Sequence, residues 1–93
     1  MSPTLSYLDF RARFRDVAGD FFADTKQLAA QLVNEGHTDL GEEVQLAIEA
    51  GSTGSEILMR LRAVFERALA REGLAESTRQ KVLFQLEAVN RSL

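Results

Sequence analysis

Apolar side chains recur along this chain at steps of three and four residues, which is the period of an amphipathic helix. The longest such stripe falls in a helix that we expect over residues 4–34, with Ser2 and Pro3 suited to its start. The stripe passes through Gly19 without a change of phase, and an internal glycine costs only up to about 1 kcal/mol relative to alanine. We therefore expect one long helix, with or without a kink at Gly19. A break there, which would give five helices in all, is the alternative. The stripe consists of Tyr7, Phe10, Phe14, Val17, Phe21, Leu28 and Leu32.

Three further helices are predicted over residues 40–50, 54–71 and 78–93. Each follows a capping box, in which a small polar residue and an acid or amide three positions later bond reciprocally to backbone amides. Glycines stand where the first three helices should end. The boxes are Asp39 with Glu42, Thr53 with Glu56 and Ser77 with Gln80, and the glycines are Gly36, Gly51 and Gly73.

The apolar faces of these helices define the expected core. No segment alternates as a strand does, and 93 residues make one domain. We predict a single all-α domain over residues 1–93, a small bundle of four helices with short connections. The residues expected to face inward are Leu40, Val44, Ala47, Ile48, Ile57, Leu58, Leu61, Val64, Phe65, Ala68, Leu69, Val82, Leu83, Leu86, Val89 and Leu93.

Charge and composition narrow the classes of function. The net charge is −3, with four basic against nine acidic residues in residues 1–50 and seven against five in residues 51–93. An acidic balance argues against a general nucleic-acid binder, which needs a basic patch. The chain has no cysteine and no apolar stretch near the ~20 residues that span a bilayer. We expect a soluble, cytoplasmic protein without a membrane segment.

Residues suited to catalysis or metal binding are scarce. His37 is the only histidine and falls in a predicted connection. Glu42 and Glu43 point in different directions on a helix, and Asp20 with Asp24 makes a single exposed pair. No serine or threonine has a matched base. We expect neither an enzyme nor a metal or cofactor site.

The run GSTGS at residues 51–55 admits three interpretations. The amino end of a helix attracts anions, and the hydroxyls of the run could add donors. Against a phosphate site, the lysine of a P-loop is missing, and Glu49 and Glu56 would repel an anion. We favour a capped turn between two helices over an anion site.

The third interpretation is a helix-turn-helix unit over residues 40–71. Ala47, four positions before Gly51, fits the close approach of its two helices, and Arg60 could touch DNA. However, Ser52 stands where an apolar residue is normal, and Arg60 stands where a buried aliphatic residue is expected. A DNA-binding regulator is therefore the alternative, and nucleic acid is not the expected partner.

Three apolar residues fall outside the inward stripes: Leu46, Met59 and Phe84. Single exposed apolar residues are normal, but aromatic residues and methionine are enriched in interfaces. The long first helix also carries more aromatic surface than shorter helices would cover. These features predict binding to another protein and suggest a homodimer formed through the first helix.

A basic edge on the third helix, formed by Arg60, Arg67 and Arg71, is either a solvated face or a contact for an acidic partner or subunit. Taken together, the sequence predicts a non-enzymatic interaction protein that occupies a partner's surface. Its size and acidity suit a small adaptor, a regulator, or an immunity or antitoxin-like protein.

Overall fold

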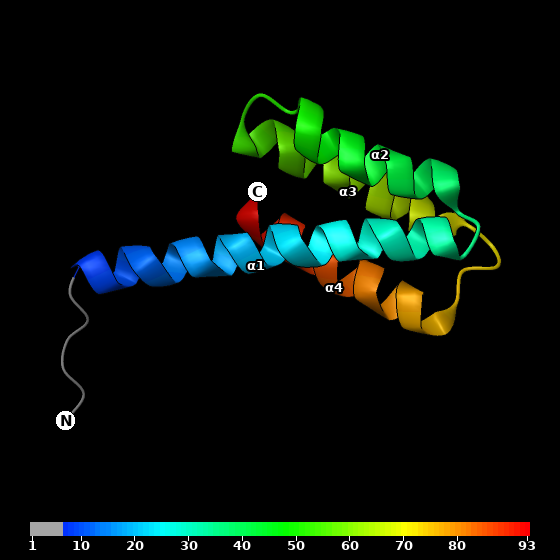
Figure 1. Ribbon diagram of the computed structural model, residues 1–93, viewed down its shortest axis with the longest axis horizontal. Coiled ribbons are helices and arrows are strands. Elements are labelled where there is room, and N and C mark those ends of the chain that lie inside the picture. The colour runs from blue at the N-terminus through cyan, green and yellow to red at the C-terminus, as the bar shows by residue number, and fades with distance from the viewer. Residues whose placement is uncertain (1–6) are drawn as a thin grey trace.

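The computed structural model describes the backbone of residues 7–93 and the side chains of residues 21–93. Four helices make up this part of the chain, and it contains no strand (Figure 1). They are α1 (Tyr7–Asn34), α2 (Thr38–Ala50), α3 (Gly54–Ala70) and α4 (Glu76–Ser92). The predicted all-α bundle of four helices is confirmed.

Helix α1 is continuous through Gly19, so the five-helix alternative is wrong. Its 28 residues extend about 42 Å at 1.5 Å per residue, whereas the 17 residues of α4 extend about 25 Å. The predicted start, with Ser2 and Pro3, lies outside the described residues.

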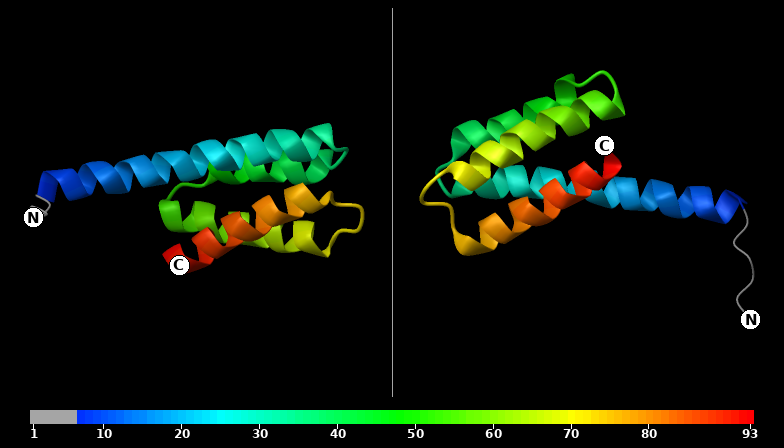
Figure 2. Two further views of the ribbon diagram at one scale, coloured as in Figure 1. Left: turned by 90° about the horizontal axis from the view of Figure 1, so that it is seen from below. Right: turned by 180° about the vertical axis from the view of Figure 1, so that it is seen from behind.

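The helices pack in a ring in which each contacts the two beside it. Helix α1 packs on α2 and α4, and α3 packs on the same two helices (Figures 1 and 2). Both figures also show that the first half of α1 extends past the ends of the other three helices. The molecule is therefore elongated, with extents of 50 × 30 × 20 Å.

The core lies between the four helices, and most of its predicted members are buried or packed against it. Leu83 and Leu93 were predicted to face inward, and this is wrong, since they are 41% and 49% exposed. Val82, Gln85 and Val89 fix the inward face of α4, which turns Leu83 outward, and Leu93 follows the end of the helix. The buried apolar residues are Leu28, Ala29, Leu32, Leu40, Val44, Ala47, Leu61, Val64, Phe65, Ala68, Leu74, Val82 and Val89.

Of the three predicted capping boxes, only that of α3 forms. The backbone N–H of Glu56 donates to Thr53 Oγ1 at 3.1 Å, and the Glu56 carboxylate accepts from the N–H of Ser52 at 3.2 Å. The boxes at Asp39 and Ser77 are wrong: α2 and α4 each begin two residues earlier than predicted, without a side-chain cap. The Asp39 carboxylate is bound instead by Arg71, the residue that follows α3, as described below.

Gly36 ends α1 as predicted. Its φ of 91° lies in the left-handed region that glycine adopts without strain. Its N–H donates to the carbonyl of Val33 at 3.1 Å, and the N–H of His37 donates to that of Leu32 at 2.8 Å. These two bonds form a Schellman motif, which turns the chain tightly from α1 into α2.

Candidate protein-binding surface

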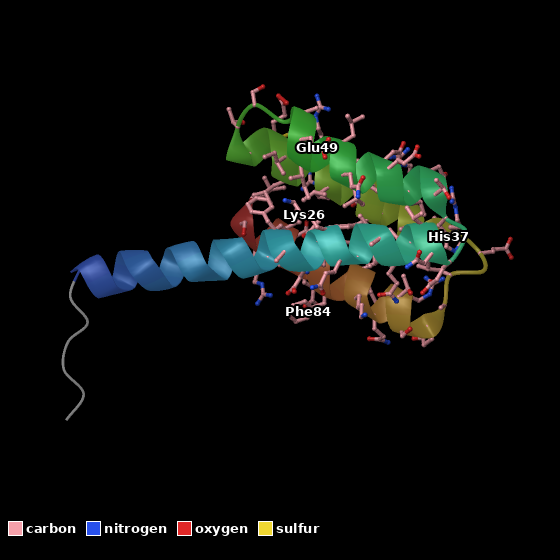
Figure 3. All side chains as sticks on the ribbon, in the orientation of Figure 1. Lys26, His37, Glu49 and Phe84 are labelled. Carbon is pink, nitrogen blue, oxygen red and sulfur yellow. The ribbon has the colours of Figure 1, made fainter. Side chains whose placement is uncertain are left out.

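Phe84 is the most exposed large apolar side chain among the described residues, at 64%. Val82, Gln85 and Val89 point into the core and so fix the rotation of α4. A helix turns about 100° per residue, which leaves Phe84 on the outer side. In Figure 3, Phe84 lies on the opposite side of α1 from Glu49 of α2. This aromatic ring therefore belongs to the α1 and α4 side of the molecule.

Phe84 lines an open groove of about 510 Å³ between α1 and α4. The groove combines the aromatic ring and the edge of buried Leu28 with four side-chain amides, one acid and one base. This mixture suits a polypeptide surface, because apolar anchors surrounded by polar groups are typical of protein interfaces. The lining residues are Asp24, Gln27, Leu28 and Gln31 of α1 and Gln80, Lys81, Phe84 and Gln85 of α4.

A buried polar contact joins the two helices beneath the groove. The hydroxyl oxygen of Thr25, which is fully buried, lies 2.8 Å from Gln85 Oε1 and 2.7 Å from the carbonyl oxygen of Phe21. The hydroxyl has one proton and donates to one of these oxygens at a time. A buried polar group that lost its partner would cost stability, so this contact favours one register of α1 on α4.

A second polar network closes one end of the groove. Thr78, also fully buried, donates to the carboxylate of Glu35 at 2.7–2.8 Å and accepts from Gln31 Nε2 at 2.7 Å. Lys81 Nζ donates to Gln31 Oε1 at 2.8 Å. Residues from the end of α1 and the start of α4 are thus tied together, which holds this side of the groove in place.

The network also alters the titration of Glu35. Hydrogen bonds from Thr78 and then Gln31 stabilise the charged carboxylate and lower its pKa below the ordinary value. Glu35 therefore stays ionised, and remains an acceptor for Thr78, to a lower pH than an ordinary glutamate would.

Leu46 and Met59 are exposed as the sequence predicts, each at 56%. The structure does not bring them together with Phe84, because they lie on α2 and α3 and contribute nothing to the groove. Single exposed apolar side chains of this kind need no function. Among the three, Phe84 alone lines the groove.

The basic edge of α3 meets the acidic side of α2 within the same chain. Arg71 donates to both carboxylate oxygens of Asp39 through its two terminal guanidinium nitrogens, at 2.7 and 2.6 Å, and Arg67 binds Glu43. The Arg71 guanidinium holds the pKa of the Asp39 carboxyl well below its usual range. These pairs connect successive turns of α2 and α3, so the two helices run antiparallel side by side (Figure 1).

Arg60, the third member of the predicted basic edge, lies 3.5 Å from Glu56 one turn earlier on α3. The same Glu56 carboxylate accepts from the Ser52 N–H at the start of the helix. It therefore takes one of the donors that an anion bound at residues 51–55 would need.

Several polar contacts that hold α4 against its neighbours were not predicted from the sequence. Arg79 of α4 donates to the carbonyl of Leu69 at 2.9 Å and so binds the carboxyl end of α3. Thr25 lies in phase with the stripe of α1, and Gln85 lies in phase with Val82. Helical spacing alone would have marked these two as buried, but it would not have paired them.

The other candidate sites among the described residues have fewer features of a binding site. A smaller hollow of about 210 Å³ lies between α1 and α2 and is lined by Lys26, Gln45, Ile48 and Glu49. Lys26 and Glu49 are labelled in Figure 3. His37 precedes α2 without a side-chain cap bond. Within residues 21–93, no three acidic or histidine side chains gather as a metal site would require.

No helix in the described part of the chain is long and apolar enough to cross a membrane. Comparison with protein-family models, with curated proteins and with solved structures finds no match.

Proposed function

We propose that this protein acts by binding another polypeptide through the groove between α1 and α4, with Phe84 as the apolar anchor. The observation that carries the proposal is the 64% exposure of Phe84 at the edge of an open groove. Aromatic anchors surrounded by polar groups dominate the binding energy of many interfaces. The small size and acidic net charge of the protein suit an adaptor, a regulator, or an immunity or antitoxin-like protein.

The arrangement of α2 and α3 favours this proposal over the DNA-binding alternative. Helices of a helix-turn-helix unit cross at about 90–120°, whereas the ion pairs of Arg67 and Arg71 run along two antiparallel helices. All three arginines of the predicted basic edge are paired with carboxylates of the same chain. They are therefore less available to phosphates.

The proposal is tested by capturing proteins from an extract with the immobilised chain and two charged variants. Phe84→Arg places a charge in the groove and should lower the recovery of specific partners at least tenfold. Met59→Arg is the matched control, since it charges a similarly accessible apolar residue outside the groove. Equal recovery by Phe84→Arg and the unaltered protein, from a chain that is itself a monomer, would refute the proposal.

A further inference from the structure

The first half of α1 is a helix without a helical neighbour in the described chain. Figures 1 and 2 show the first half of α1 running beyond the ends of α2, α3 and α4. In sequence, this half carries Phe10, Phe14 and Val17 at steps of four and three. Short helices are marginal in water without tertiary packing, so this half of α1 requires a surface to pack against.

The α1–α4 groove lies along the other half of the same helix. Positions 10, 14, 17, 21, 24, 28 and 31 follow one another at alternating steps of four and three, which is the spacing of a helix-pairing seam. Asp24 and Gln31 of this seam line the groove together with the edge of Leu28, whereas Phe21 and most of Leu28 pack into the core of their own chain. A single seam therefore joins the projecting half of α1 to the groove.

We propose that the polypeptide seated in the groove is the projecting half of α1 from a second copy of this chain. The two α1 helices run antiparallel, and a two-fold axis makes each copy both donor and acceptor. Full overlap of Tyr7–Asn34 places residue 10 opposite residue 31, 14 opposite 27, and 17 opposite 24. Gln31, Gln27 and Asp24 of one copy then lie opposite apolar positions of the other.

Charge and area are consistent with self-association. Residues 7–20 contain three arginines and three aspartates, and the groove contains one acid and one base, so neither surface repels the other through net charge. Each copy contributes Phe10, Phe14 and Phe84. At roughly 150–250 Å² per fully buried aromatic side chain, these six rings supply on the order of 1,000 Å², near the lower size of a specific interface.

This inference rests on the proposed function, since it names the occupant of the same groove. Static light scattering on the full chain tests it first, and the expected mass is twice the 10.3 kDa of one chain. Phe84→Arg and, independently, Gln27→Arg should raise the dissociation constant at least tenfold, whereas Met59→Arg should leave it unchanged. Circular dichroism checks that each variant keeps its helices. A wild-type mass of one chain at high micromolar concentration would overturn the inference.

Disulfide cross-linking tests the register, because the chain has no cysteine of its own. Val17→Cys combined with Asp24→Cys should give a covalent dimer on mild oxidation. Residues 17 and 24 of one helix lie about 10.5 Å apart, too far for a disulfide within the chain. The two single variants are the controls and should cross-link much less. A dimer without this cross-link, and insensitive to Phe84→Arg, would overturn the inference.

The two proposals fail in different ways. If the chain is a monomer and Phe84→Arg still abolishes capture of a different protein, the groove binds a partner and the dimer is wrong. If the chain is a monomer and the variant captures the same proteins as the unaltered chain, both proposals are wrong.

Discussion

Gly41 determines how closely α1 and α2 approach. A Cβ atom at this buried position would lie 2.5 Å from Val33 Cγ2 and 2.6 Å from the carbonyl oxygen of Ala29. The Val33 side chain can rotate, but the Ala29 carbonyl belongs to the backbone of α1. Relief would therefore require the two helices to move apart, which loosens packing along their contact.

Gly41→Ala is expected to destabilise the fold by about 1–3 kcal/mol through this overpacking. Gly54→Ala is the matched control: it begins α3 with open space around the added methyl group. That control should be neutral or stabilising by up to about 1 kcal/mol, because alanine is the better helix former. Urea unfolding followed by circular dichroism measures both values, and equal stabilities would contradict the close approach.

Thr78 gives a prediction about pH. A carboxylate whose pKa is lower in the folded than in the unfolded state stabilises the fold above its unfolded pKa, near 4, and this contribution is lost as pH falls through the folded value. Glu35 is such a group because Thr78 and Gln31 donate to it. Thr78→Val removes the main donor, so the melting temperature of the variant should fall less steeply with acid below pH 5. Melting curves that differ only by a constant offset would argue against this role.

Among the helix starts, the local sequence predicted the cap of α3 correctly and the caps of α2 and α4 wrongly. The Thr53 box forms as predicted from four consecutive residues. The equally good box at Asp39 does not form, because its carboxylate is bound by Arg71, 32 positions away. Capping rules consider only neighbours in sequence and do not account for such long-range ion pairs.

Thr53→Ala should therefore lower the free energy of unfolding by about 1 kcal/mol, the usual contribution of a side-chain cap. Ser77→Ala is the control, because Ser77 lies inside α4 and its cap was predicted but does not form. The cost of that change should be within about 0.5 kcal/mol of zero, as for most surface substitutions. Thermal unfolding of the two variants checks the assignment, and a larger loss for Ser77→Ala would reverse it.

Over the molecule as a whole, the number of helices, the continuity of α1 and most of the core could be predicted from hydrophobic periodicity. The exposure of Phe84 could also be predicted, because it depends on the rotation of one helix. The groove could not be predicted, because its position depends on the packing of α1 on α4. That pairing joins residues as far apart as Thr25 and Gln85, which no local pattern specifies.

Small-angle X-ray scattering of the unaltered chain tests whether the projecting half of α1 of one copy binds in the groove of a second copy. Full antiparallel overlap doubles the mass from 10.3 kDa while the longest dimension grows little beyond the 50 Å of a single copy. A particle with the mass of one chain would contradict the antiparallel dimer. A particle of doubled mass and about doubled length would contradict the full overlap of the two α1 helices.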